Sequence, residues 1–100
     1  MNDEKEFDFR TSSSDFATYL MLQGYDFQYI EVIVDKRHYN RLKAFIHFKG
    51  IKEILIELQR KYDSGNVLVE PIAFSITRKK LNKEIKDNLD KYRLTHNTRR

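Results

Sequence analysis

The segment Arg41–Phe48 alternates between apolar residues and residues that could bind a polyanion. Successive side chains of an extended strand point to opposite faces, so each set has a face of its own. The apolar face carries Leu42, Ala44, Ile46 and Phe48. The other face carries Arg41, Lys43, Phe45 and His47. Cationic groups hold phosphates and aromatic rings stack on bases, which makes nucleic-acid binding the sharpest hypothesis that this chain offers.

This octamer resembles the longer signature of RNA-recognition-motif domains, [KR]-G-[FY]-[GA]-[FY]-V-x-[FY]. The positions that match are Arg41, Ala44, Phe45, Phe48 and, conservatively, Ile46. Leu42 replaces the glycine, and Lys43 replaces the first aromatic residue, which removes a stacking platform worth roughly 1–3 kcal/mol. The alternative is that an amphipathic strand with a few aromatic residues gives this partial match by chance.

The C-terminal part of the chain supplies a second candidate surface. Residues 76–100 hold nine basic residues against three acidic ones, whereas residues 1–9 hold four acidic residues against one basic residue. Apolar residues at helical spacing from Phe74 to Tyr92 predict a long helix with a basic outer side. If this helix covers the sheet face that carries Phe45, that face is core, and the predicted contacts are instead Lys79, Lys83 and Lys86. The alternative is a solvated helix face, partly neutralised by acidic neighbours.

Other kinds of site find little support in the sequence. The chain has no cysteine, which excludes a disulfide, a thiolate nucleophile and a cysteine-based zinc site. The histidines, His38, His47 and His96, are too far apart for a metal site on one element. No nucleophile turn surrounds the serine run 12–14, which we interpret as helix capping, and the isolated glycines form no phosphate loop. We therefore expect no enzymatic activity, no metal and no cofactor; the weakest alternative is a small enzyme, which a pocket joining His47 to a carboxylate would favour.

The periodicity predicts an α+β fold, with a small antiparallel sheet and helices. The expected elements are a strand around Phe7 and Phe9, a helix at 15–23, strands at 27–34 and 41–49, a helix at 51–62, a short strand at 67–69 and a helix from Pro71 to about 92. Gly50 is expected to end the third strand. This order matches a ferredoxin-like βαββαβ arrangement with an extra C-terminal helix. The alternative is a three-stranded sheet in which Val67–Val69 is only a connector.

The length of 100 residues allows one domain. We expect a flexible acidic N-terminus at 1–6, a single α+β domain at 7–92 and a flexible basic tail at 93–100. The N-terminus lacks the apolar run of a secretory signal, and no apolar stretch is long enough to span a bilayer. We therefore expect a cytoplasmic protein with no membrane partner.

Several short pieces of the chain also carry a family resemblance. They are Phe9–Ser12, Ala17–Leu20, Gly24–Tyr25, Ala44–Phe48, Tyr62–Gly65, Val67–Pro71, Phe74, Leu81 and Ile85. Together they resemble a family of small uncharacterised domains from bacteriophages, prophages and other mobile elements, mainly of low-G·C Gram-positive bacteria. The resemblance covers about residues 7–86, but the hairpin loop at 35–40 is longer and the tail more basic than in that family. It implies a phage-like accessory protein of small α+β fold, which as a viral protein would work in the host cytoplasm, and supplies no activity and no functional residues.

The leading hypothesis is therefore a small, basic, non-enzymatic binding protein that contacts DNA or RNA. An open sheet face predicts contacts through Arg41, Lys43, Phe45 and His47, and a covered face predicts contacts through the last helix. The alternative is a protein–protein interaction module that binds a host or phage protein, or a homo-oligomer. Exposed apolar residues of the last helix or an unpaired strand edge would then make the contact.

Overall fold

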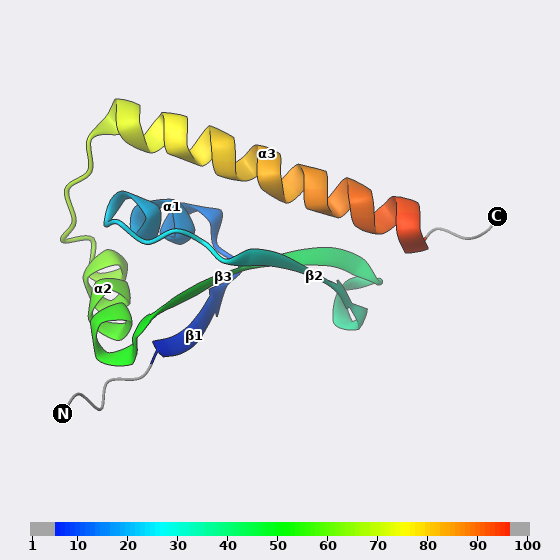
Figure 1. The fold of residues 1–100 in the computed structure, drawn as a ribbon, viewed down its shortest axis with the longest axis horizontal. Helices are drawn as coiled ribbons and strands as arrows, with labels where there is room; N and C mark the ends of the chain where they lie inside the picture. Colours follow the sequence, from blue (N-terminus) through cyan, green and yellow to red (C-terminus); the bar gives the residue numbers. More distant parts are fainter. Residues whose placement is uncertain (1–5, 97–100) are drawn as a thin grey trace.

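A three-stranded antiparallel sheet with the strand order β1-β3-β2 forms the base of the molecule (Figure 1). The computed structural model describes residues 6–96. Its elements are β1 (Glu6–Thr11), α1 (Ser14–Leu22), β2 (Tyr29–Asp35), the short 3₁₀ helix η1 (Lys36–His38), β3 (Arg41–Ile51), α2 (Lys52–Ser64) and α3 (Pro71–His96). Both β1 and β2 run antiparallel to β3, so β3 lies inside a split β-α-β unit. The predicted α+β class is confirmed.

The fourth strand expected at Val67–Val69 does not form within the described residues, and the three-stranded alternative is the one observed. Residues 66–70 connect α2 to α3 without regular structure. Val67 packs against the core, whereas the neighbouring Leu68 is 98% exposed. The segment has the β propensity of a strand, but a strand also needs the backbone groups of a neighbour, and this segment has none.

Local signals set the ends of the helices. The Ser13 hydroxyl accepts a hydrogen bond of 3.0 Å from the amide of Phe16 and so caps α1, which confirms that the serine run serves capping. Gly24 follows α1 with a φ of 100°, and Gly65 follows α2 with a φ of 80°. Both angles lie in the left-handed region, which glycine adopts without a Cβ clash. Pro71 begins α3, where its missing amide proton is not needed.

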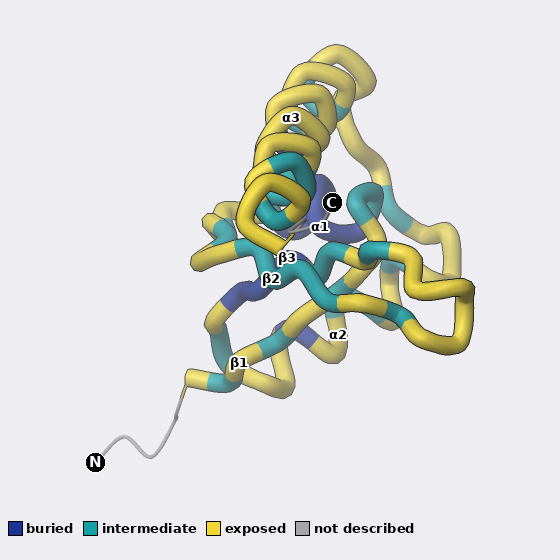
Figure 2. The backbone as a smooth tube through the Cα atoms, turned by 90° about the vertical axis from the view of Figure 1, so that its right-hand side faces the viewer, coloured by how far each residue is buried: buried dark blue, intermediate teal, exposed yellow. Residues whose placement is uncertain are grey.

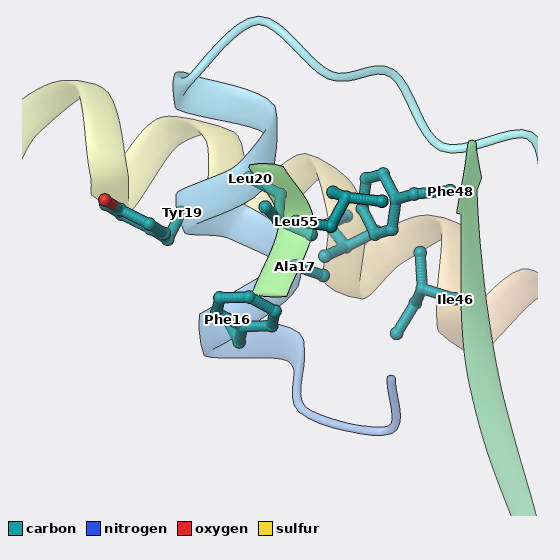
Figure 3. Close-up of a cluster of buried hydrophobic side chains, with 8 residues drawn as sticks. Phe16, Ala17, Tyr19, Leu20, Ile46, Phe48 and Leu55 are labelled. Carbon is teal, nitrogen blue, oxygen red and sulfur yellow. The ribbon is translucent and has the colours of Figure 1, made fainter. Parts of the chain in front are cut away.

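The core lies between one face of the sheet and the helices. Both α1 and α3 cover that face, and the other face is turned away from them (Figures 1 and 2). The core consists of Phe16, Ala17, Tyr19 and Leu20 of α1, Ile46 and Phe48 of β3, Leu55 of α2 and Leu81 of α3 (Figure 3). The apolar side of the Arg41–Phe48 alternation is therefore the side that the helices bury.

The third strand continues through Gly50 to Ile51, so the expectation that Gly50 ends this strand is wrong. Gly50 pairs with Phe7 of β1 in the antiparallel register. A Cβ atom at Gly50 would lie 2.8 Å from the ring of Tyr25, so the missing side chain lets that ring pack directly against the strand.

Two predicted boundaries shift in the structure. Glu6 belongs to β1, and α3 continues past residue 92 to His96. The rest of the expected acidic N-terminus, 1–5, and the end of the expected tail, 97–100, lie outside the described residues. In the part of the chain that the structure describes, no helix is both long and apolar enough to cross a membrane.

Candidate nucleic-acid interface

The predicted contact residues of β3 lie on the sheet face that α1 and α3 leave uncovered (Figure 2). We call it the outer face. It carries Glu6, Asp8 and Arg10 of β1, Arg41, Lys43, Phe45, His47 and Lys49 of β3, and Tyr29, Glu31, Ile33 and Asp35 of β2. The end of α3 instead faces Ile30 and Val32 on the opposite side of β2. The helix therefore does not cover Phe45, and the first of the two predicted surfaces is the open one.

His47 lies at the centre of the outer face and is 5% exposed. Its Nδ1 is 3.2 Å from Oδ1 of Asp8 in β1, and its Nε2 is 2.8 Å from Oε1 of Glu31 in β2. Carboxylates only accept hydrogen bonds, and each of the two ring nitrogens of His47 lies within hydrogen-bond distance of one carboxylate. His47 thus joins all three strands and has no ring nitrogen left for a phosphate.

The aromatic rings beside His47 are also occupied. The ring of Tyr29 stacks on the imidazole, with the ring centroids 4.2 Å apart and the planes 13° from parallel. The guanidinium carbon of Arg10 lies 4.0 Å from the centroid of the Phe45 ring, in a cation–π contact. An incoming base must displace Arg10 to stack on that face of Phe45. The base platform predicted for the sheet is therefore already filled by the protein itself.

Glu31 ties the two contacts together, because it accepts hydrogen bonds from both His47 and Arg10, the latter at 3.1 Å. The hydrogen bond from His47 is the main reason that the pKa of Glu31 lies below its ordinary value, while partial burial opposes this shift and Arg10 reinforces it. The centre of the outer face thus sets two carboxylates, Asp8 and Glu31, beside the guanidinium of Arg10 and the imidazole of His47. With two carboxylates at its centre, this part of the face offers little attraction to a polyanion.

The other two predicted residues of β3, Arg41 and Lys43, lie where the hairpin from β2 turns into β3, and both are exposed. The structure adds Lys36 and Arg37 of η1, which gives four cationic side chains within eight residues. We call the set Lys36, Arg37, Arg41 and Lys43 the basic hairpin. Within residues 6–96, no carboxylate forms an ion pair with any of the four.

Asp35 is the one acidic residue between positions 35 and 43, and its carboxylate accepts hydrogen bonds inside the turn. It contacts Nδ1 of His38 at 2.8 Å and accepts the amide of Arg37 at 3.1 Å. The contact with His38 is the main cause that lowers the pKa of Asp35. Asp35, His38, Arg41, Leu42 and Lys43 line a shallow hollow on this hairpin. The hollow therefore presents two cations beside an acidic residue whose hydrogen bonds go to His38 and Arg37, and Lys43 is a smaller cause of the lowered pKa of Asp35.

The cationic residues predicted on the last helix lie elsewhere. Lys83 and Lys86 bind Asp87 and Asp90, at 3.0 and 2.9 Å, in exposed pairs one helical turn apart. The first half of α3, which carries Lys79 and Lys83, packs over α1 (Figure 1). The structure therefore does not bring Lys79, Lys83 and Lys86 together with the basic hairpin.

Sequence reasoning missed Lys36, Arg37 and Tyr39, because the run 35–40 was treated only as a loop. Adjacent cations and an aromatic ring directly before a predicted binding strand are the signal that could have identified them. In the described part of the chain, no three acidic or histidine side chains are arranged to hold a metal ion. Comparison of the chain with protein-family models, with curated proteins and with solved structures gave no match in any of the three.

Proposed function

We propose that this protein binds nucleic acid through the basic hairpin and acts as a binding protein rather than an enzyme. The observation that carries the proposal is that Lys36, Arg37, Arg41 and Lys43 fall within eight residues of one hairpin and form no ion pair with a carboxylate of the described residues. Cations of this kind neutralise phosphates and release the counterions that surround a nucleic acid, which supplies most of its sequence-independent affinity.

In this proposal the residues of β3 on the outer face have two different roles. Arg41 and Lys43 contact phosphates, whereas Phe45 and His47 hold the three strands in register beneath them. Phosphate contacts position a nucleic acid without selecting its sequence, so we expect weak sequence preference. The cytoplasmic location and the role as an accessory factor of a phage or mobile element are parts of the same proposal.

A salt titration tests the proposal. Fluorescence anisotropy measures the binding of labelled single- and double-stranded DNA and RNA, each about 20 nucleotides long. Four phosphate contacts predict a slope of roughly −3 when the logarithm of the binding constant is plotted against the logarithm of the salt concentration. Absence of binding to all four probes at about 50 mM salt contradicts the proposal.

A pair of charge-reversal variants locates the contact. Arg41→Glu with Lys43→Glu and Lys79→Glu with Lys83→Glu change the net charge of the protein by the same amount at two different places. We expect the hairpin variant to lose most of the affinity and the α3 variant to lose much less. Equal losses would mean that the total charge of the protein, rather than the hairpin, attracts the nucleic acid.

A second candidate function, protein–protein interaction, is favoured by an apolar surface at the start of α3. Ile72 and Ile76 are one helical turn apart and both exposed, and Leu68 lies in the connector that leads into this helix. Light scattering detects a homo-oligomer, and capture from nuclease-treated host lysate detects another partner. Loss of this contact in Ile72→Lys, with no effect of Arg41→Glu and Lys43→Glu, favours this function over nucleic-acid binding.

A further inference from the structure

Tyr39 lies at the tip of the hairpin, between η1 and β3, and is 96% exposed. Its backbone has φ 60° and ψ 39°, in the left-handed region. A tyrosine is uncommon there because its Cβ atom approaches the following carbonyl oxygen. Asn40 has the same φ, but asparagine tolerates this region better. The fold thus holds a large aromatic ring in solvent, on strained backbone, with almost no burial in return.

The availability of this ring distinguishes it from the other aromatic side chains near the hairpin. Tyr29 stacks on His47, and Tyr92 stacks on His96 with the ring centroids 3.8 Å apart. Phe45 lies beneath the guanidinium of Arg10. Tyr39 is the most exposed aromatic residue of the described chain, and cationic residues lie two positions before it and two positions after it, Arg37 and Arg41.

We propose that Tyr39 stacks on an unpaired base of single-stranded nucleic acid while the basic hairpin holds the phosphates on either side. This inference rests on the proposed function and specifies its ligand. Bases in a duplex already stack on one another, so an exposed ring has access to a base face only where the strand is unpaired. A ring among cations is the combination by which proteins bind single strands without reading their sequence.

The chain contains no tryptophan, so Tyr39→Trp places a single indole reporter at the hairpin tip. Stacking on a base quenches indole fluorescence. We expect quenching by single-stranded DNA or RNA and much less by a duplex of the same sequence, and separate DNA and RNA titrations identify which strand is preferred. Leu68→Trp is the matched control, because Leu68 is 98% exposed and lies far from the hairpin, on the α2–α3 connector (Figure 1). The fluorescence of Leu68→Trp should not change when nucleic acid is added.

An affinity measurement on the natural ring supports the reporter. We expect Tyr39→Ala to weaken single-strand binding by about 5- to 150-fold, the effect of losing one stacked base, with little change for a duplex. Tyr39→Phe should retain the affinity, because stacking needs the ring and not the hydroxyl.

The outcomes separate this inference from the proposed function. If the unmodified protein binds no nucleic acid, both are overturned. If it binds and the hairpin charge reversal abolishes binding, while Tyr39→Ala binds normally and Tyr39→Trp is not quenched, the proposed function stands and the stacking role of Tyr39 is overturned. Circular dichroism of each variant confirms that it is folded.

Discussion

Two parts of the same strand face behave differently. At Phe45 and His47, each ring and each charge has a partner from β1 or β2. Arg41 and Lys43 come earlier on the same face of β3, and their cationic groups form no ion pair with a carboxylate of the described residues. Charged and aromatic side chains therefore do not mark a binding surface by their type alone. What distinguishes the hairpin from the centre of the sheet is that its cations form no ion pair with a carboxylate of the described residues, although the ammonium of Lys43 lies 5.4 Å from the centroid of the Phe45 ring.

The difference between the two parts of β3 is tested most strongly by removing the imidazole of His47. We expect His47→Ala to lower the free energy of unfolding by roughly 2–3 kcal/mol, because a buried ring is lost and two carboxylates lose a shared hydrogen-bond partner. Urea denaturation measures the change. Lys43→Ala, on the same face of the same strand, should change the free energy of unfolding by less than about 0.5 kcal/mol. Equal effects of the two substitutions would contradict the division of the strand into a structural and a binding half.

Removing the cations of the hairpin should weaken binding without changing the free energy of unfolding. We expect Arg41→Ala with Lys43→Ala to weaken nucleic-acid binding by about tenfold at moderate salt and to reduce the salt slope by roughly 1.4, because two phosphate contacts to a single strand are lost. Anisotropy titrations at several salt concentrations measure both quantities. A weaker affinity with an unchanged slope would show that the variant lost something other than phosphate contacts.

Local residue patterns predicted much of the fold and little of the site. Alternation in Arg41–Phe48 identified the buried face correctly, because side-chain direction in a strand depends only on position. The cap at Ser13 and the helix start at Pro71 were also predictable, since each depends on the residue itself and its nearest neighbours. The same local reasoning assigned a strand to Val67–Val69, where the missing partner is a long-range property.

The partners of His47 could not be predicted in this way. Asp8 is 39 residues away along the chain and Glu31 is 16 residues away, and only the register of three strands brings them to the imidazole. Gly50 illustrates the same limit, because the ring that requires its missing side chain belongs to Tyr25, on the loop after α1. The availability of a side chain depends on such tertiary neighbours, which residue types do not reveal.

Acidification tests the contribution of the Glu31 carboxylate at the centre of the sheet. Because the folded-state pKa of Glu31 lies below its ordinary value of 4.5, its ionised form stabilises the fold above that value, and this contribution is lost as the pH falls through the lowered pKa. We expect Glu31→Gln to be less stable than the natural protein at neutral pH, and the difference to close as the pH falls below 4.5 and through the lowered pKa of Glu31. Thermal unfolding between about pH 7 and pH 3 measures it.

The control for this pH dependence is in the hairpin. Asp35 also has a lowered pKa, caused mainly by His38. Asp35→Asn should therefore be less stable than the natural protein at neutral pH, and this difference in stability should also close on acidification, without Arg10 or His47 being involved. Combining the two substitutions should give additive losses, because the two carboxylates have separate partners. If the difference in stability between Glu31→Gln and the natural protein does not depend on pH, the Glu31 carboxylate acts by its shape and not by its charge.

The smallest expected effect is also the one with an unusual sign. Replacing Tyr39 by glycine removes the Cβ clash of the left-handed backbone, although glycine makes the unfolded chain more flexible, so we expect a gain of about 0.5 kcal/mol in the free energy of unfolding. Lys36→Gly, at a position where φ is negative, should instead lose stability. Thermal unfolding measures both variants, and Tyr39→Gly should at the same time bind single strands more weakly. If Tyr39 serves an external ligand, its replacement should stabilise the fold and weaken binding. A loss of stability in Tyr39→Gly would instead mean that the ring supports the hairpin itself.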